Sequence, residues 1–349
     1  MMKKVIALLS TLSLAMVLLA GCSGSGQSAS QSHEKELVIS TWGFSQDFFK
    51  KNVYAPFEKA NHVKIVIETG NNADRLNKIR QGSSKVDVVY LSDYFAQQAI
   101  AEGLIDKIDP KKLTHLDELY PIARAPLGKS YGPAYTISRL GIVYNPKSIQ
   151  SKMTSWNDLW QANLKGKLTL PDISSTSGPM LVDIAAAHSG NHFNEDKAFQ
   201  NLKTINKNVV KYYSQTSDFI NMFSQDEASV GPMMEMYLND IKKAVPSAKF
   251  VIPSEGAYAI ENTVNVVKGS KNKALAEKFI NWQISKTAQE RSALAKIDSP
   301  ANKTVKLTSK QAEGLTYGAD AFKNLKKLDM NFVNKHLKAW TLRWNRKIR

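Results

Sequence analysis

The sequence predicts an α/β protein with a mainly parallel sheet that is covered by helices and divided between two lobes. Between residues 37 and 103, β-rich and helical segments alternate three times, and this alternation is typical of parallel strands joined by helices. About 310 residues have the composition of a folded protein, which is too many for one small core.

Residues 1–21 have the pattern of an export signal. A short basic start precedes an apolar run at 5–20, and this run is shorter than the roughly 20 residues of a membrane-spanning helix. The tripeptide Leu-Ala-Gly then precedes Cys22, the single cysteine of the chain. This string resembles a bacterial lipobox, which implies cleavage before Cys22, lipidation of its thiol, and a tether to the outer face of the cytoplasmic membrane. The alternative is an ordinary cleaved signal followed by an incidental cysteine.

Residues 22–35 are expected to form a flexible linker. The stretch 23–32 consists mainly of Ser, Gly and Gln, and contains no apolar residue larger than alanine. Such a segment cannot bury enough apolar surface to fold. Folded sequence is therefore expected to begin near Glu36.

The first part of the folded sequence supplies three strand–helix pairs. Its strands are β-prone, and its helices carry apolar side chains near helical spacing. Ser92 and Asp93 are suited to cap the third helix, which Gly103 ends. The expected strands are 37–42, 63–67 and 86–91, and the expected helices are 44–60, 72–81 and 94–102.

The remainder of the chain also mixes the two kinds of element. A hydroxyl-rich turn at 174–178 follows a strand and precedes a helix of small residues. The expected strands are 131–136, 141–144, 166–170, 228–231 and 264–267, and the expected helices are 154–160, 180–188, 198–208, 217–224, 234–244 and 273–286.

The net charge of +16 favours anionic partners in general. No Arg-rich tract and no recognition motif for nucleic acid is present in the sequence. We therefore expect no nucleic-acid partner and interpret the excess as affinity for an anionic envelope surface. Much of it lies between residues 323 and 349, which we expect to form a solvated helix face.

Several strings together resemble the extracellular solute-binding proteins of ABC importers, closest to the polyamine-binding branch of the type II, iron/thiamine/polyamine-like group. The most specific is Ser-Trp-Asn-Asp-Leu-Trp at 155–160. The resemblance covers residues 37 to about 300 and also rests on strings at 86–94, 102–105, 108–111, 131–135, 141–145, 164–168 and 273–281.

This resemblance implies a two-lobe periplasmic-binding-protein-like type II fold with two hinge crossings, near 135–138 and 261–264. One small solute, a polyamine such as spermidine or putrescine or a related cationic or zwitterionic compound, would bind between the lobes. The closed form would then deliver it to the permease. The implied divisions are 36–136 with 263–307 for lobe 1, 137–262 for lobe 2, and 308–349 for a helical segment that packs on the lobes.

The resemblance also implies the residues that meet the solute. Aromatic and hydroxyl side chains of lobe 1 and the crossings would wall the cleft, and carboxylates would pair with ammonium groups. The candidates are Trp42, Ser92, Tyr94, Tyr135, Met234, Glu235, Tyr258, Glu261 and Asn262.

A hydroxyl-rich turn favours a different solute. The family's acidic pair after the strand at 166–170 is not reproduced here, and hydroxyl residues stand in its place. Hydroxyls and backbone N–H groups at a helix N-terminus attract anions, although a simple helix cap is the alternative. The residues concerned are Ser174, Ser175, Thr176 and Ser177.

Other function classes have less support. The six histidines are scattered, and HExxH, CxxC and GxSxG motifs are absent from the sequence, so we expect neither an enzyme nor a cofactor or metal centre. A thiamine-, phosphonate- or iron-type receptor is the runner-up, and a surface adhesin-like lipoprotein is a distant alternative. A monomer is the expected state.

Overall fold

The computed structural model describes residues 35–82, 85–190 and 192–348. Lys35–Arg349 form one compact unit. The predicted signal peptide, Cys22 and nearly all of the predicted linker lie outside the described residues. Within the described part of the chain, no helix has both the length and the hydropathy needed to cross a bilayer.

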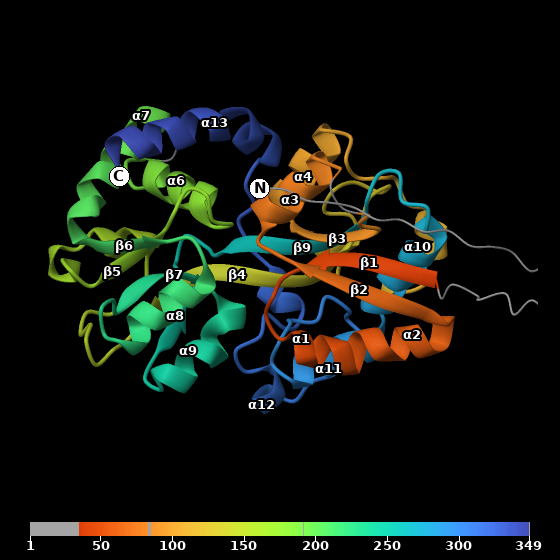
Figure 1. The fold of residues 1–349 in the computed structure, drawn as a ribbon. Coiled ribbons are helices and arrows are strands. Elements are labelled where there is room, and N and C mark those ends of the chain that lie inside the picture. The colour runs from red at the N-terminus through yellow and green to blue at the C-terminus, as the bar shows by residue number, and fades with distance from the viewer. Residues whose placement is uncertain (1–34, 83–84, 191, 349) are drawn as a thin grey trace, which may run out of the picture. The chain divides into compact units, whose positions relative to one another are not determined.

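One nine-stranded sheet runs through the compact unit, in the order β2-β1-β3-β9-β4-β7-β5-β6, with β8 paired to β4 (Figure 1). The pairs β1–β2, β1–β3, β5–β6 and β5–β7 are parallel, and all pairs made by β4 and β9 are antiparallel. The prediction of a mainly parallel sheet is therefore wrong. The sheet is mixed, because its two long strands run against their neighbours. The strands are β1 Lys35–Thr41, β2 Val63–Thr69, β3 Val88–Ser92, β4 Ala134–Tyr144, β5 Leu168–Pro171, β6 Val209–Tyr213, β7 Val230–Met234, β8 Lys249–Val251 and β9 Tyr258–Val266.

Helices cover both faces of this sheet. Figure 1 shows α3 and α4 above β1–β3 with α2 and α11 below, and α6 and α7 above the other end with α8 and α9 below. The α-helices are α1 Gln46–Phe49, α2 Ala55–Asn61, α3 Asn72–Arg80, α4 Asp93–Ala101, α5 Pro121–Arg124, α6 Gly178–Ala187, α7 Glu195–Ile205, α8 Thr216–Ser224, α9 Leu238–Ala244, α10 Lys273–Gln283, α11 Lys286–Leu294, α12 Ser309–Ala312 and α13 Met330–Lys347.

Several boundaries differ from the sequence prediction. The two β runs at 131–144 form the single strand β4, and the helix expected at 44–60 is α1 and α2 joined by a π-helical turn at Lys50–Tyr54. The helix expected at 154–160 is a 3-10 helix that Ser155 and Asp158 begin with a capping box. Short elements of this kind are decided by packing more than by local propensity.

The hydrophobic core forms four clusters, one on each face of the sheet at each of its ends. We call β1–β3 with their helices the first half, and β5–β7 with theirs the second half. The long strands β4 and β9 contribute to clusters of both halves, and they contain the predicted crossings near 135–138 and 261–264. The lobe limits at 136, 262 and 307 stay predictions.

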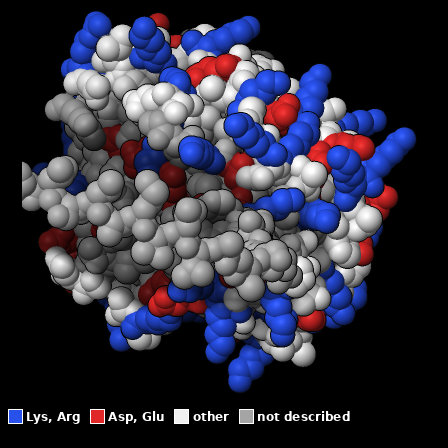
Figure 2. Space-filling view, turned by 45° about the vertical axis from the view of Figure 1, so that its right-hand side comes forward, with Lys and Arg blue, Asp and Glu red and all other residues white. Residues whose placement is uncertain are grey.

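The helix α13 packs against both halves. Trp340 and Trp344 are buried in a cluster of the second half, and Leu337 also touches a cluster of the first half. On the face shown in Figure 2, blue Lys and Arg side chains project around the periphery with red acidic side chains between them.

Candidate functional site

A cleft of about 730 Å³ lies where the strands of both halves end. The segments that follow β1 and β2 line it from the first half, and the segments that follow β5, β6 and β7 line it from the second half. Loops at the carboxyl ends of strands are the usual place for ligands in α/β sheets. Its volume is in the range of small-molecule sites.

Aromatic rings form the first-half wall of the cleft. Trp42 follows β1 directly and packs edge-on against Tyr90, with ring centroids 5.9 Å apart. Tyr135 of β4 lies 6.3 Å from the Trp42 ring and is buried. Together, Trp42 and Tyr135 offer an apolar and aromatic surface to a bound solute.

A buried arginine supports this wall. The Arg75 guanidinium carbon lies 4.3 Å from the centroid of the Trp42 ring, and its Nη2 donates to Asn72 Oδ1 at 2.8 Å. Arg75 is 1% exposed and its Nε has no hydrogen-bond partner among the described residues. Burial lowers the pKa of Arg75 to about 9. The cleft therefore has a buried positive charge behind Trp42, and the neighbouring Asp74 carboxylate partly stabilises it.

The hydroxyl turn before α6 forms part of the opposite wall. The Ser174 hydroxyl donates to Asp172 Oδ1 at 2.6 Å, and the Ser175 hydroxyl donates to the Asp172 carbonyl at 2.8 Å. Ser177, at the N-cap of α6, makes no side-chain capping hydrogen bond, and the first turn of α6 contains no acidic residue. Two of the hydroxyls are thus used within the turn, and the first turn of α6 itself places no carboxylate against the helix dipole.

Two contacts join the halves across the cleft. Asn72 Nδ2 donates to Thr176 Oγ1 at 3.2 Å, and the Phe44 and Tyr237 rings meet edge to face at 6.3 Å. Asn72 is itself held, because its Oδ1 also accepts from the Ser92 N–H at 3.1 Å. These contacts connect the site to the relative placement of the two halves.

Acidic side chains lie at the cleft and beneath it. Asp74 and Asp240 line the cleft and are exposed, and Asp240 pairs with Lys243 at 2.7 Å. Asp298 is buried, and neither carboxylate oxygen has a hydrogen-bond partner among the described residues. Burial raises the pKa of Asp298 to about 7.

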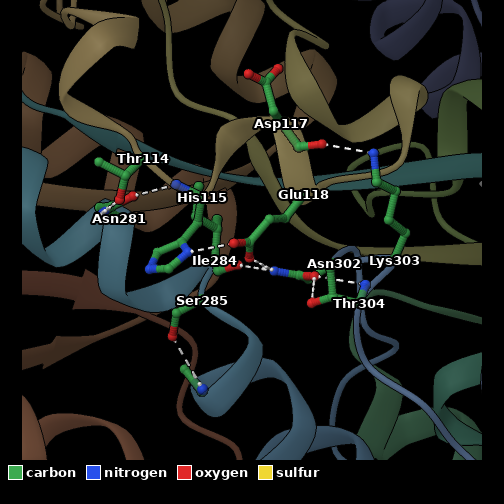
Figure 3. Close-up of polar contacts among 11 residues, drawn as sticks. Thr114, His115, Asp117, Glu118, Asn281, Ile284, Ser285, Asn302, Lys303 and Thr304 are labelled. Carbon is green, nitrogen blue, oxygen red and sulfur yellow. Dashed lines mark hydrogen bonds and ion pairs between the residues drawn. The ribbon is translucent and has the colours of Figure 1, made fainter.

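A polar network supports Tyr135 from the first half. Glu118 lies between His115 and Asn302 in Figure 3, at 3.1 Å from His115 Nδ1 and 2.8 Å from Asn302 Nδ2. The bond from Asn302, with a smaller contribution from His115, lowers the pKa of Glu118. Gln289 accepts from the Asn302 N–H at 3.2 Å and donates to the Tyr135 carbonyl at 2.6 Å. This network fixes the backbone of β4 at the cleft.

The structure brings eight of the predicted site residues together. These residues line the cleft from both halves and from β4 and β9. They are Trp42, Tyr135, Ser174, Ser175, Thr176, Ser177, Met234 and Asn262. Their contact with a solute stays a prediction.

Three further predicted residues do not line the cleft, and each has a different environment. Ser92 is buried at the N-terminus of α4 without a side-chain capping bond. Tyr94 packs in the core against Phe95, with ring centroids 4.0 Å apart. Tyr258 donates to Asp183 Oδ2 at 2.6 Å and lines a separate cavity of about 400 Å³.

The two predicted carboxylates, Glu235 and Glu261, also lie outside the cleft lining. Glu235 accepts from Arg139 at 2.6 and 2.7 Å and from Thr316 at 2.8 Å. Glu261 forms an ion pair with Lys327, and burial raises the pKa of Glu261. Both carboxylates thus have protein cations as partners.

Sequence reasoning missed several cleft residues. Asn72 and Asp74 follow the second strand, and this position after a strand was a usable signal. Phe44 and Tyr237 likewise stand three residues after the ends of β1 and β7, so the same signal applied to them. Among the described residues, no group of three or more His, Cys, Asp or Glu side chains is arranged to bind a metal ion.

Comparison with known proteins identifies the family. A sequence model described as bacterial extracellular solute-binding protein matches residues 52–319. A spermidine/putrescine-binding periplasmic protein of Haemophilus influenzae is 26% identical over 275 residues, which cover 74% of this chain and 73% of the relative. A putrescine-binding periplasmic protein of Pseudomonas aeruginosa is 23% identical over 293 residues, which cover 77% and 78%.

Solved structures agree with this result. The crystal structure of an ABC transporter protein from Clostridium perfringens is 41% identical, with a TM-score of 0.78, and the match covers 90% of this chain and 100% of that one. The predicted α/β fold of periplasmic-binding-protein type is therefore confirmed. From the match over most of its length and from this shared fold, the chain belongs to the bacterial extracellular solute-binding proteins.

Proposed function

We propose that this chain is the solute receptor of an ABC importer, which captures one small solute in the cleft and presents it to the permease without changing it chemically. The observation that carries the proposal is the cleft itself, which both halves line at their strand ends and which the Asn72–Thr176 bond spans. A solute that contacts both walls would stabilise the closed arrangement.

The leading solute class is a polyamine or another small amine. The two relatives described above carry spermidine or putrescine in their names. The aromatic pair Trp42 and Tyr135 suits methylene chains and cation–π contact. Asp74 is the cleft-lining carboxylate best placed to meet an ammonium group, since Asp240 already pairs with Lys243. Glu235 and Glu261 lie outside the cleft lining and also pair with protein cations.

A solute with an anionic group is the second candidate. The N-terminus of α6 has no acidic residue in its first turn, and Thr176 and Ser177 lie beside it. The positive charge of Arg75 behind Trp42 favours the same class. A phosphonate- or phosphate-bearing amine would use both ends of the cleft.

Placement in the cell follows the sequence prediction. We infer that cleavage before Cys22 and lipidation of its thiol tether a monomeric receptor outside the cytoplasmic membrane. Mass spectrometry of the intact protein from the membrane fraction tests this, because the proposal requires a chain that begins at Cys22 and carries the added mass of the lipid. A chain without that added mass would contradict it.

A thermal-shift screen of Lys35–Arg349 tests the receptor function. The panel contains putrescine, spermidine, thiamine, thiamine phosphates, 2-aminoethylphosphonate, choline and ferric iron, and a ligand of the folded state raises Tm by mass action. Titration calorimetry then compares Trp42→Ala with the control Trp160→Ala, whose ring stacks on His188 outside the cleft. Loss of solute binding in Trp42→Ala but not in Trp160→Ala supports the cleft as the solute-binding site. Equal loss in both variants, or no ligand in a broad panel, would count against it.

A further inference from the structure

The outer face of α13 forms a basic ridge. The helix Met330–Lys347 contains no acidic residue, and Lys335, Lys338, Leu342 and Arg346 follow one another at steps of three or four residues. Residues at such steps share one face of a helix. All four are exposed. We use the name basic ridge for these four residues.

The opposite face of α13 fixes the ridge in place. Val333, Trp340 and Trp344 are buried in a core cluster of the second half. Trp340 also donates through Nε1 to Glu195 Oε2 at 3.1 Å. The helix therefore cannot turn its basic side chains inward, and it lies along the edge of the fold beside α7 (Figure 1).

The ridge charges have no ion-pair partners in the described part of the chain. Within residues 35–82, 85–190 and 192–348, Lys335, Lys338 and Arg346 make no ion pair. Arg343, which lies off the ridge, does make ion pairs, with Glu195 at 3.1 Å and Asp196 at 2.6 Å. The two acidic residues of α7 are thus paired with Arg343. The ridge therefore presents uncompensated positive charge to solvent.

One apolar side chain accompanies this charge. Leu342 on the ridge is 50% exposed. Phe193 is 39% exposed, but it lies against another side of α13. The Phe193 ring is packed against Phe332 and Trp340 of α13, with centroids 5.2 and 5.8 Å apart. Large apolar side chains among lysines and arginines on a surface helix are typical of adsorption to a lipid interface.

We propose that the basic ridge of α13 docks on an anionic lipid bilayer. Lipid headgroup charge complements the unpaired ridge cations, and the Leu342 side chain fits the boundary between headgroups and acyl chains. The contact goes beyond solute capture, does not depend on the lipid anchor, and would orient the receptor on the membrane. A purely electrostatic contact with an acidic protein is the competing explanation.

Vesicle sedimentation tests this docking with the compact unit Lys35–Arg349, which lacks Cys22. Vesicles of phosphatidylcholine alone are compared with vesicles that also contain phosphatidylglycerol, at low and high salt. The ridge variant is K335Q/K338Q/R346Q, and the control K50Q/K51Q/K59Q removes the same charge from exposed lysines of the first half. All six side chains are outside the core, so Tm should stay unchanged.

The unmodified protein should bind the anionic vesicles, and high salt should weaken binding. Each ridge charge should raise the affinity for anionic vesicles about fivefold, so the ridge variant should bind them about a hundredfold more weakly. The control variant should bind with nearly the affinity of the unmodified protein. Leu342→Ser should weaken binding that remains at high salt. If the ridge and control variants lose the same affinity, net charge explains the binding and the proposal is wrong. The proposal is also wrong if the unmodified protein binds neutral vesicles equally well, or binds no vesicles. Trp42→Ala should bind vesicles as well as the unmodified protein does. The docking proposal can therefore fail while the proposed solute binding holds, and the reverse.

Discussion

Replacing Glu235 by alanine tests whether this carboxylate stabilises the fold or contacts the solute. Its oxygens accept two hydrogen bonds from Arg139, at 2.6 and 2.7 Å, and one from Thr316 at 2.8 Å. The side chains of Arg139 and Glu235 are 14% and 9% exposed. Glu235→Ala would therefore leave a guanidinium and a hydroxyl without their acceptor inside the protein.

The magnitude follows from the cost of breaking a buried pair on one side, which is about 3–5 kcal/mol. One kcal/mol corresponds to about 2 °C in Tm for a domain of this size, so Glu235→Ala should lower Tm by about 6–10 °C. Glu235→Gln retains one acceptor and should cost less. The pair R139M/E235L removes both charges and should be more stable than Glu235→Ala, because no buried charge is left alone.

Scanning calorimetry and solute titration on the same variants decide between the two roles. Our reasoning requires a lower Tm with a nearly unchanged Kd once a solute is known. If Glu235→Ala melts like the unmodified protein and binds the solute more than about tenfold more weakly, which is over 1.4 kcal/mol, then the carboxylate faces the solute. The structural role argued from Arg139 and Thr316 would then be wrong.

Three other predictions concern the cleft, its floor and α13. Thr176→Val removes the bond to Asn72 across the cleft and should weaken solute binding by about 0.5–1.5 kcal/mol. Titration calorimetry measures this, and an unchanged Kd would contradict it. The raised pKa of Asp298, about 7, means that the folded protein keeps a proton that the unfolded chain loses above about pH 4. Stability should thus fall as pH rises from about 4 to 7 and then level off, and Asp298→Asn should flatten this slope in urea unfolding. A parallel slope in the variant would exclude Asp298 as the cause. Trp344→Ala, at a fully buried position, should cost about 3–5 kcal/mol in the same assay. A cost near that of an exposed residue would mean that α13 is not part of the core.

Local pattern predicted much of the fold. The strands β1, β2 and β3 and the helices α3 and α4 lie close to the ranges expected from β-prone runs and helical spacing. Such signals reside in a few consecutive residues and do not need the rest of the chain. The predicted element boundaries were wrong where the backbone conformation changes without a strong local signal. The π-helical turn at Lys50–Tyr54 is one example.

The same logic explains which cleft residues could be predicted. Trp42 and the turn at Ser174–Ser177 directly follow strands, and a residue after a strand points to the carboxyl edge of the sheet wherever that strand lies. Arg75 lacked such a signal. Its contact with Trp42 depends on how α3 packs against the end of β1.

The sequence by itself determined the α/β class, the strand-end positions of the cleft and the absence of acids from α13, because each depends on residue type and local order. Only the tertiary structure decided the partners. Glu235 and Glu261 resemble ligand carboxylates in the sequence, yet Arg139 lies 96 residues from the first and Lys327 lies 66 residues from the second. Asn72 meets Thr176 across 104 residues. Whether a charge is available to a solute depends on what the folded chain places within about 4 Å of it, and no local pattern contains that distance.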